Sequence, residues 1–281
     1  MAGICQDCMT GHVLPGEPKG TTSNVDGAYF TSAPASAPTS EQQNEAEVGR
    51  KTALVLLTDM FGLALSNPRI LADRFAERLG CDVYVPDLFE GHPPIDADQL
   101  QPYTPDVPNT HYSLWNRLTY YLLWIPKLPS LWANRPSVGR AKAEQFIQDL
   151  KDKKGYTDIG VIGYCYGGGI AVGLATKKGF VNVLVACHPG PITESEFPHV
   201  LTPLAMFCSQ EDPWVTPPKR ARAEAALAKL DTVETKVETL PGTVHGFAAR
   251  PNLGIPQVRD AFERTFEECV QWIQARIHRH E

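Results

Sequence analysis

A cysteine between glycines is the residue with the clearest chemical potential in this sequence. Cys165 lies in the segment GYCYGG (163–168), directly after the apolar stretch 159–163 and before a helix-like segment. A nucleophile at a sharp strand-to-helix turn needs small neighbours, because larger side chains would collide with the adjacent strand and helix. A helix N-terminus also favours a thiolate. The pattern therefore predicts a thiol nucleophile rather than a buried structural cysteine or a dinucleotide-binding loop, whose glycine spacing it does not match.

Two later residues have the types and the order that such a nucleophile requires. Asp212 follows the apolar segment PLAMFC (203–208), and His245 lies in PGTVHGF after the last expected strand. In α/β-hydrolases the order along the chain is nucleophile, acid, histidine. Glu211 is the alternative acid, and Asp212 has the alternative role of starting the turn before a helix over 217–230. We expect Cys165, Asp212 and His245 to form a catalytic triad.

These three residues are sufficient for acyl transfer to a thiol. His245 takes the proton of Cys165, the thiolate attacks an acyl carbon, and Asp212 stabilises the imidazolium before water releases the acyl group. The backbone N–H groups of Tyr166 and Met60 are the expected oxyanion donors. No metal or cofactor is called for, since no nucleotide or metal motif of the usual kinds occurs.

The segments around these residues alternate between short apolar runs and amphipathic stretches. Asn67 is a plausible N-cap and Gly80 a stop for a helix between them, and a last helix is expected over 256–277. Such alternation predicts an α/β-hydrolase fold, a mostly parallel central sheet flanked by helices in one domain over residues 1–281. Strands are expected near 28–31, 52–59, 82–86, 159–163, 181–187, 203–208 and 233–240.

Residues 93–136 interrupt this alternation. The stretch holds 8 of the 24 prolines, three of the five tryptophans and four of the nine tyrosines. Its centre, 114–125, is too short to span a bilayer and carries one charge, so we expect a buried or interfacial helix. The interpretation favoured here is an inserted aromatic and proline-rich lid over a pocket, with plain core or a dimer contact as alternatives.

Composition excludes several classes of protein. The formal net charge is −6 and no block of Lys or Arg stands out, which argues against nucleic-acid binding, and no membrane-spanning run occurs. Seven cysteines in a long chain suggest reduced thiols in the cytoplasm. Cys5 and Cys8 form a CxxC with His12 nearby, which is more often incidental than half of a zinc site. Both a monomer and a homodimer remain open.

The motifs together resemble the dienelactone hydrolase family. The family has a cysteine in the same strand-to-helix turn (163–167, here called the elbow) and the same order of triad residues, and the segments TDMFGL (58–63) and VPDLF (85–89) are also similar to it. The N-terminal pattern is similar to that of its fungal branch, with Cys5, Cys8, Gly11, Gly16, Pro18 and Gly20. The resemblance implies hydrolysis of a small ester or lactone. It places Asp59 where members often have a glutamate that holds the resting cysteine, and Arg250 near an arginine that binds a substrate carboxylate.

Three further residues complete the expected substrate site. Phe61 and Tyr164 adjoin the oxyanion and nucleophile positions, and His188 ends a strand, so we expect them beside the substrate together with Asp59 and Arg250. Two other functions remain open. One is a thioesterase, an acyltransferase or a related cofactor-free step in secondary metabolism, which a dry pocket favours. The other is a non-catalytic ligand-binding protein that keeps the fold.

Overall fold

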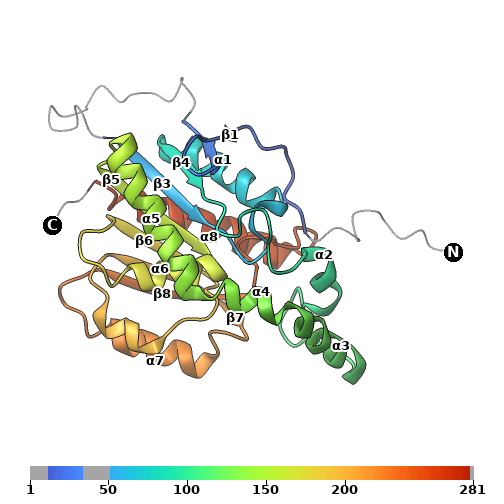
Figure 1. Cartoon of the computed structure of the whole chain (residues 1–281). Coiled ribbons are helices and arrows are strands. Elements are labelled where there is room, and N and C mark those ends of the chain that lie inside the picture. The colour runs from blue at the N-terminus through green and yellow to red at the C-terminus, as the bar shows by residue number, and fades with distance from the viewer. Residues whose placement is uncertain (1–11, 34–50, 279–281) are drawn as a thin grey trace.

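The computed structural model describes residues 12–33 and 51–278, which form one eight-stranded sheet with helices on both faces (Figure 1). The strand order is β1-β2-β4-β3-β5-β6-β7-β8. The six strands from β4 to β8 in this order are parallel, whereas β1 and β2 are added antiparallel at one edge. The predicted α/β-hydrolase fold is confirmed. The strands are β1 (Thr21–Thr22), β2 (Tyr29–Thr31), β3 (Thr52–Leu57), β4 (Asp82–Val85), β5 (Asp158–Tyr164), β6 (Val183–Cys187), β7 (Leu204–Glu211) and β8 (Thr235–Val244).

The central strands form because both of their faces are covered. β5 and β6 are buried at every residue, as expected for continuous apolar runs in a parallel sheet. Leu57 pairs with Gly163, and Tyr164 with Cys187, so the ends of β3, β5 and β6 meet at the same edge of the sheet. This carboxyl edge is where an open α/β sheet places its ligands.

The helices build one hydrophobic core on each face of the sheet. Leu71 of α1 and Phe262 and Phe266 of α8 pack on one face, whereas Ile147 of α5 and Ile170 of α6 pack on the other. The apolar stripe expected on the last helix is therefore the buried side of α8. The helices of these layers are α1 (Asn67–Leu79), α5 (Pro136–Lys154), α6 (Tyr166–Leu174), α7 (Pro217–Leu227) and α8 (Pro256–Gln274), with short 3-10 turns η3 (Gly62–Ala64) and η6 (Glu194–His199).

The start of α1 differs from the prediction. Ser66 is the N-cap residue, whereas Asn67 is already helical and fully buried. The Asn67 amide donates to the carbonyl oxygens of His12 and Ala249 and accepts from the N–H of Leu14. Asn67 therefore ties the N-terminal segment to the loop after His245, a role that local sequence does not reveal. Gly80 ends the helix in the left-handed conformation, as expected.

Residues 93–136 form a helical arm that extends from the sheet (Figure 1). The sequence predicted a buried or interfacial helix over 114–125. No residue of α3 is buried, so the buried alternative is wrong, because an apolar composition alone does not place a helix inside a core. Within the described residues, no helix is both long and apolar enough to cross a membrane. The arm consists of α2 (Ala97–Leu100), η4 (Gln101–Tyr103), α3 (Leu114–Trp124), η5 (Ile125–Lys127) and α4 (Leu128–Ala133).

Candidate active site

Cys165 occupies a strained turn between β5 and α6. Its backbone has φ 49° and ψ −111°, a conformation that non-glycine residues rarely adopt. A Cβ on Gly163 would lie 2.1 Å from the carbonyl oxygen of Gly167, and a Cβ on Gly167 would lie 2.3 Å from that of Leu57. The two glycines let strand and helix approach closely enough to hold the turn. The thiol consequently stands at the N-terminus of α6, where unpaired N–H groups favour negative charge.

His245 lies between the thiol and a carboxylate. Its Nε2 is 3.0 Å from Cys165 Sγ, and its Nδ1 is 2.8 Å from Asp212 Oδ2. Asp212 follows β7 and His245 follows β8, so two neighbouring strand ends bring these side chains to the elbow. The alternative acid, Glu211, instead accepts a hydrogen bond from the N–H of Asn109. The structure therefore brings the three sequence-predicted residues together in the expected order.

The Asp212 carboxylate is held by a complete set of donors. Oδ1 accepts from the N–H groups of Trp214 and Val215 at 2.8 and 3.1 Å, and Oδ2 accepts from Ser209 Oγ at 2.8 Å in addition to His245. These contacts fix the carboxylate so that it faces Nδ1 of the imidazole. Ser209 was not singled out from the sequence, although its position three residues before the acid is a usable signal.

Electrostatics in this cluster favour an imidazolium. Burial alone would lower the pKa of His245, but negative charge on Cys165 and Asp212 outweighs burial and raises it to about 10. Burial likewise opposes ionisation of Asp212, yet His245 and the hydrogen-bond donors lower the pKa of the carboxyl to about 2. At neutral pH the acid is thus ionised and the imidazole protonated. That charge arrangement stabilises an anion at Sγ.

The expected oxyanion donors are the backbone N–H groups of Tyr166 and Met60. Tyr166 is the first residue of α6 and Met60 belongs to the turn after β3, and neither N–H donates to another backbone group in the described parts of the chain. Gly167 N donates to the Thr58 carbonyl oxygen at 3.0 Å, which fixes the helix start against this turn. The positions suit an oxyanion hole of the usual kind.

Asp59 and Arg250 form an ion pair beside this turn. Arg250 Nε lies 2.9 Å from Asp59 Oδ2, and its guanidinium stacks over the ring of Phe61 at 4.3 Å. Asp59 Oδ1 also accepts from the N–H of Phe61. The carboxylate is therefore engaged with Arg250 and the turn, and the positive charge of Arg250 is compensated within the protein.

A cavity of about 510 Å³ opens in front of Cys165, and His245, Met60, Phe61 and Arg250 line it. The volume is in the range of pockets for small organic molecules. Six of the lining residues are aromatic, and three of these are contributed by the helical arm. The lining aromatic residues are Phe61, Tyr103, Tyr120, Trp124, Trp214 and Phe247.

Tyr164 and His188 do not reach this cavity. Tyr164 is almost fully buried, and His188 is fully buried with its ring 5.1 Å from that of His245 in an edge-to-face arrangement. Burial holds the pKa of His188 well below 6.5, so its imidazole is neutral. Neither ring nitrogen of His188 has a hydrogen-bond partner among the described residues. These two side chains pack behind the cluster of Cys165, His245 and Asp212 and do not line the cavity.

A hydrogen-bonded group of His12, Asp106 and Asn252 at the rim of the cavity, here called the polar clasp, was not predicted from the sequence. Asp106, from the stretch preceding α3, accepts from Asn252 at 2.7 Å and lies 2.6 Å from Nε2 of His12. The clasp joins the N-terminal segment, the arm and the loop after His245. Its bonded pairs are 94 and 146 residues apart in sequence, so no local signal identifies it. The Cys5 and Cys8 pair next to His12 lies outside the described residues.

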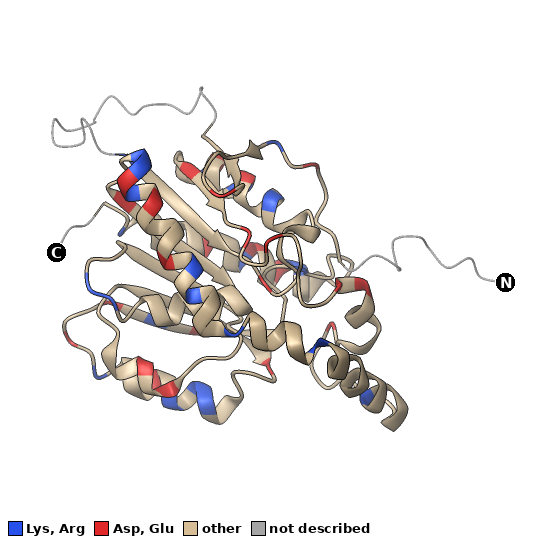
Figure 2. Ribbon diagram, in the orientation of Figure 1, with Lys and Arg blue, Asp and Glu red and all other residues tan. Residues whose placement is uncertain are grey.

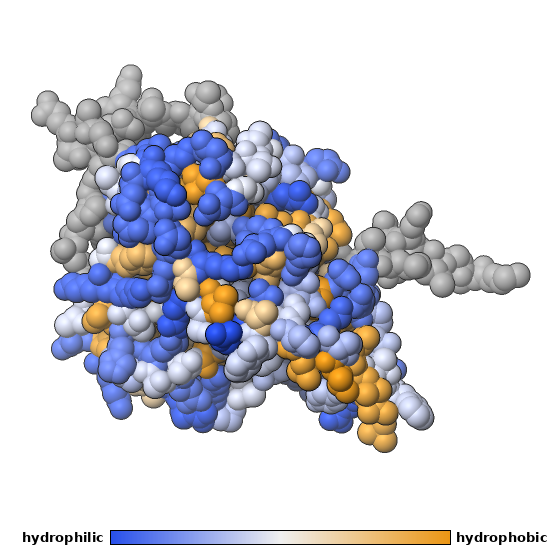
Figure 3. Space-filling view, in the orientation of Figure 1, coloured by the Kyte–Doolittle hydropathy of each residue, from blue (hydrophilic) through white to orange (hydrophobic). Residues whose placement is uncertain are grey.

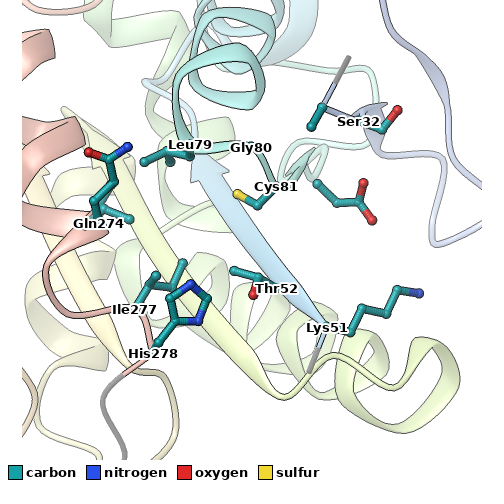
Figure 4. Close-up of a pocket in the computed structure, with 12 residues that line it drawn as sticks. Ser32, Lys51, Thr52, Leu79, Gly80, Cys81, Gln274, Ile277 and His278 are labelled. Atoms are coloured by element: carbon teal, nitrogen blue, oxygen red, sulfur yellow. The ribbon is translucent and has the colours of Figure 1, made fainter. Parts of the chain in front are cut away.

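A second hollow of about 450 Å³ lies at the opposite edge of the sheet, between the start of β3 and the ends of α1 and α8 (Figure 4). Its cysteine, Cys81, has a pKa raised to about 12 by burial and by the neighbouring Asp82. It is a poor nucleophile and is remote from the strand ends that carry the triad. No cluster of three or more potential metal ligands occurs within residues 12–33 and 51–278.

Known proteins with similar sequences and folds identify the family of this chain. The dienelactone hydrolase family profile matches residues 40–277. The chain is 31% identical to hydrolase pyvD of Aspergillus violaceofuscus over 221 residues, covering 78% of this chain and 79% of that protein. It is 30% identical to hydrolase tropI of Talaromyces stipitatus over 267 residues, covering 94% and 93%. A putative dienelactone hydrolase from Klebsiella pneumoniae has the same fold, with a TM-score of 0.56 at 14% identity and coverage of 85% and 90%.

The fold and the matched sequence define an α/β-hydrolase. The chain belongs to the dienelactone hydrolase family, in a fungal-type branch, and is a hydrolase of carboxylic esters or lactones.

Proposed function

We propose that the protein hydrolyses a small, uncharged aromatic ester or lactone through an acyl-enzyme on Cys165. The observation that carries this proposal is the chain of short contacts from Sγ to Nε2 and from Nδ1 to Asp212. A cysteine at a strained turn, in contact with a protonated imidazole and facing a cavity, has the arrangement of an activated nucleophile.

The reaction begins with Cys165 as a thiolate and His245 as an imidazolium. Sγ attacks the acyl carbon, and the N–H groups of Tyr166 and Met60 stabilise the oxyanion that forms. His245 Nε2 gives its proton to the leaving alkoxide, and the C–O bond breaks to leave a thioester. His245 then accepts a proton from water as hydroxide adds to the thioester, and the acid product leaves with regeneration of the thiolate.

The wall of the cavity indicates the substrate class. Trp124, Tyr120 and Trp214 offer aromatic faces, which favour a planar apolar ligand. Arg250 is already paired with Asp59, so a substrate carboxylate would have to compete with an internal ion pair. A neutral aryl ester or lactone therefore fits better than an anionic one.

The decisive experiment traps the acyl-enzyme. The protein is mixed with p-nitrophenyl acetate and quenched in acid within the first turnover, and intact and peptide masses are recorded. We expect an added acetyl group on the peptide containing Cys165, and none in Cys165→Ala.

Cys81→Ala is the matched control, because that thiol is also buried but lies at the other edge of the sheet. It should keep the adduct and full turnover. Turnover by Cys165→Ala at the wild-type rate, or an adduct on a different residue, would contradict the mechanism.

A further inference from the structure

The helical arm presents an apolar face that nothing in the described chain covers. Leu114 is 82% exposed, Trp115 76% and Trp132 73%. Figure 3 shows the hydrophobic surface gathered where Figure 1 places α3, and Figure 2 shows that few charged residues interrupt the arm. Soluble monomers rarely expose a contiguous apolar patch larger than a few hundred Å², so a patch of this kind indicates a partner.

The exposed residues follow a regular spacing. Large apolar side chains recur at alternating steps of four and three along the arm. The first three lie on one side of α3, and the same spacing continues in sequence through η5 into α4. This spacing of 3.5 residues is that of a seam between two packed helices. All six positions are among the exposed large hydrophobic residues: Leu114, Leu118, Tyr121, Ile125, Leu128 and Trp132.

The area of this seam is sufficient for a stable association. From the exposed fractions and the surface of such side chains, the seam and its neighbours Trp115 and Leu122 offer roughly 1,000 Å² per chain. A standard interface buries about 800 Å² on each partner. We propose that the arm pairs with the same arm of a second copy of this chain, forming a two-fold symmetric homodimer.

An anionic lipid surface is the competing occupant. The arm carries Arg117, Lys127 and Arg135. No Asp or Glu occurs from residue 107 to 143, and the two further cations of that range, Arg140 and Lys142 of α5, pair with Glu196 and Glu90. Lipid recognition of this kind uses clusters of about four to eight basic residues, and a bilayer imposes no 3.5-residue spacing. Arg117 and Lys127 also lie off the seam in sequence spacing and Arg135 lies beyond its last residue, so in the dimer all three cations remain at its flanks and end, where salt screens their repulsion. The spacing and the small number of cations favour the second copy.

The dimer would also support the catalytic cavity. The seam occupies one side of α3, whereas Tyr120 and Trp124 of the same helix line the cavity. Packing of the seam would therefore hold the wall of the pocket in place. This inference concerns the surface and does not depend on the catalytic role of Cys165.

Sedimentation velocity of the full chain tests the proposal. We expect the wild type to sediment as a dimer at roughly 50 µM and to dissociate on dilution. The double substitution Leu118→Glu and Tyr121→Glu places charges on the seam and should give a monomer, with an unchanged circular dichroism spectrum. Leu201→Glu is the matched control, since Leu201 is 43% exposed and Leu118 47%, and it should remain dimeric.

Three outcomes would overturn the proposal. They are a monomeric wild type at all concentrations, a double variant that stays dimeric, and a monomeric wild type that co-sediments with vesicles of phosphatidylserine and phosphatidylcholine. The last outcome would assign the arm to a lipid surface.

Discussion

Replacing Asp212 by asparagine isolates the charge that supports the imidazolium. The oxygen of the new amide can keep the hydrogen bonds from the N–H groups of Trp214 and Val215. Its NH₂ group then faces Nδ1 of His245, which must accept instead of donate. The imidazole is left with its proton on Nε2, directed at Cys165, and cannot take the thiol proton.

The structure gives the size of the effect. The protein lowers the pKa of Asp212 from 3.8 to about 2. This difference corresponds to about 2.5 kcal/mol of stabilisation of the carboxylate, or about 70-fold in rate if all of it acts in the transition state. The wrong tautomer adds a further loss. We expect kcat/KM of Asp212→Asn for p-nitrophenyl acetate to fall roughly 10³-fold.

Glu211→Gln is the matched comparison, because Glu211 is the neighbouring carboxylate but bonds to the Asn109 N–H. It should lose far less activity. If Asp212→Asn retained more than about a tenth of wild-type kcat/KM, or if Glu211→Gln lost as much, the assignment of Asp212 would be refuted.

The same carboxyl makes a prediction for stability. Because its folded pKa lies below the unfolded value, its contribution is present above about pH 4 and is lost as the pH falls towards 2. The difference in free energy of unfolding between wild type and Asp212→Asn should therefore shrink by more than half between pH 7 and about pH 2.5, as measured by urea titration.

Three further predictions concern the surroundings of the cluster. Gly167→Ala should cost at least about 3 kcal/mol in urea unfolding, because its Cβ would meet the Leu57 backbone. Gly179→Ala has open space and should cost only about 1 kcal/mol; equal losses would contradict the close-packing argument. The pKa of His188 lies well below 6.5, so wild-type stability should fall by up to about 1.4 kcal/mol per pH unit below pH 6. His188→Asn should flatten that slope. An unchanged slope would show that a group other than His188 causes the loss of stability at low pH. Trp124→Ala should raise KM for a phenyl ester up to about tenfold with little change in kcat; an unchanged KM would remove Trp124 from the binding wall.

The elbow could be predicted because its signals are local. The elbow lies within five consecutive residues that include Gly163, Cys165 and Gly167. The apolar strand before it and the helix after it are predicted by the periodicity of the sequence. The order of Asp212 and His245 adds a fold-level rule. The strand positions could be predicted for the same reason. Several strand ends in the structure differ from the predicted ends by two to four residues, which is the usual uncertainty of predicted boundaries.

Long-range partners could not be predicted in the same way. Asn67 has the composition of a helix cap, but its amide bonds to segments 55 and 182 residues away. The pairing of Arg250 with Asp59 spans 191 residues. The helix over 114–124 was expected to be buried or interfacial from its apolar composition, and which of the two holds depends on whether the whole fold supplies a layer that packs against it.

The site divides between the most and the least buried parts of the molecule. Cys165 is fixed by backbone contacts among Gly163, Gly167 and Leu57, so a change there alters the position of Sγ and the packing of β5 against α6 together. Trp124 belongs to an arm with no buried residue in α3 and packs against a small separate cluster that includes Phe61 and Leu100, so a change there leaves the two cores on the sheet intact and alters what the cavity admits. Substitutions at the elbow should therefore lower stability and kcat in parallel, whereas substitutions in the arm should act on KM and on substrate preference. A family that keeps one chemistry while varying its substrates would be expected to vary the arm.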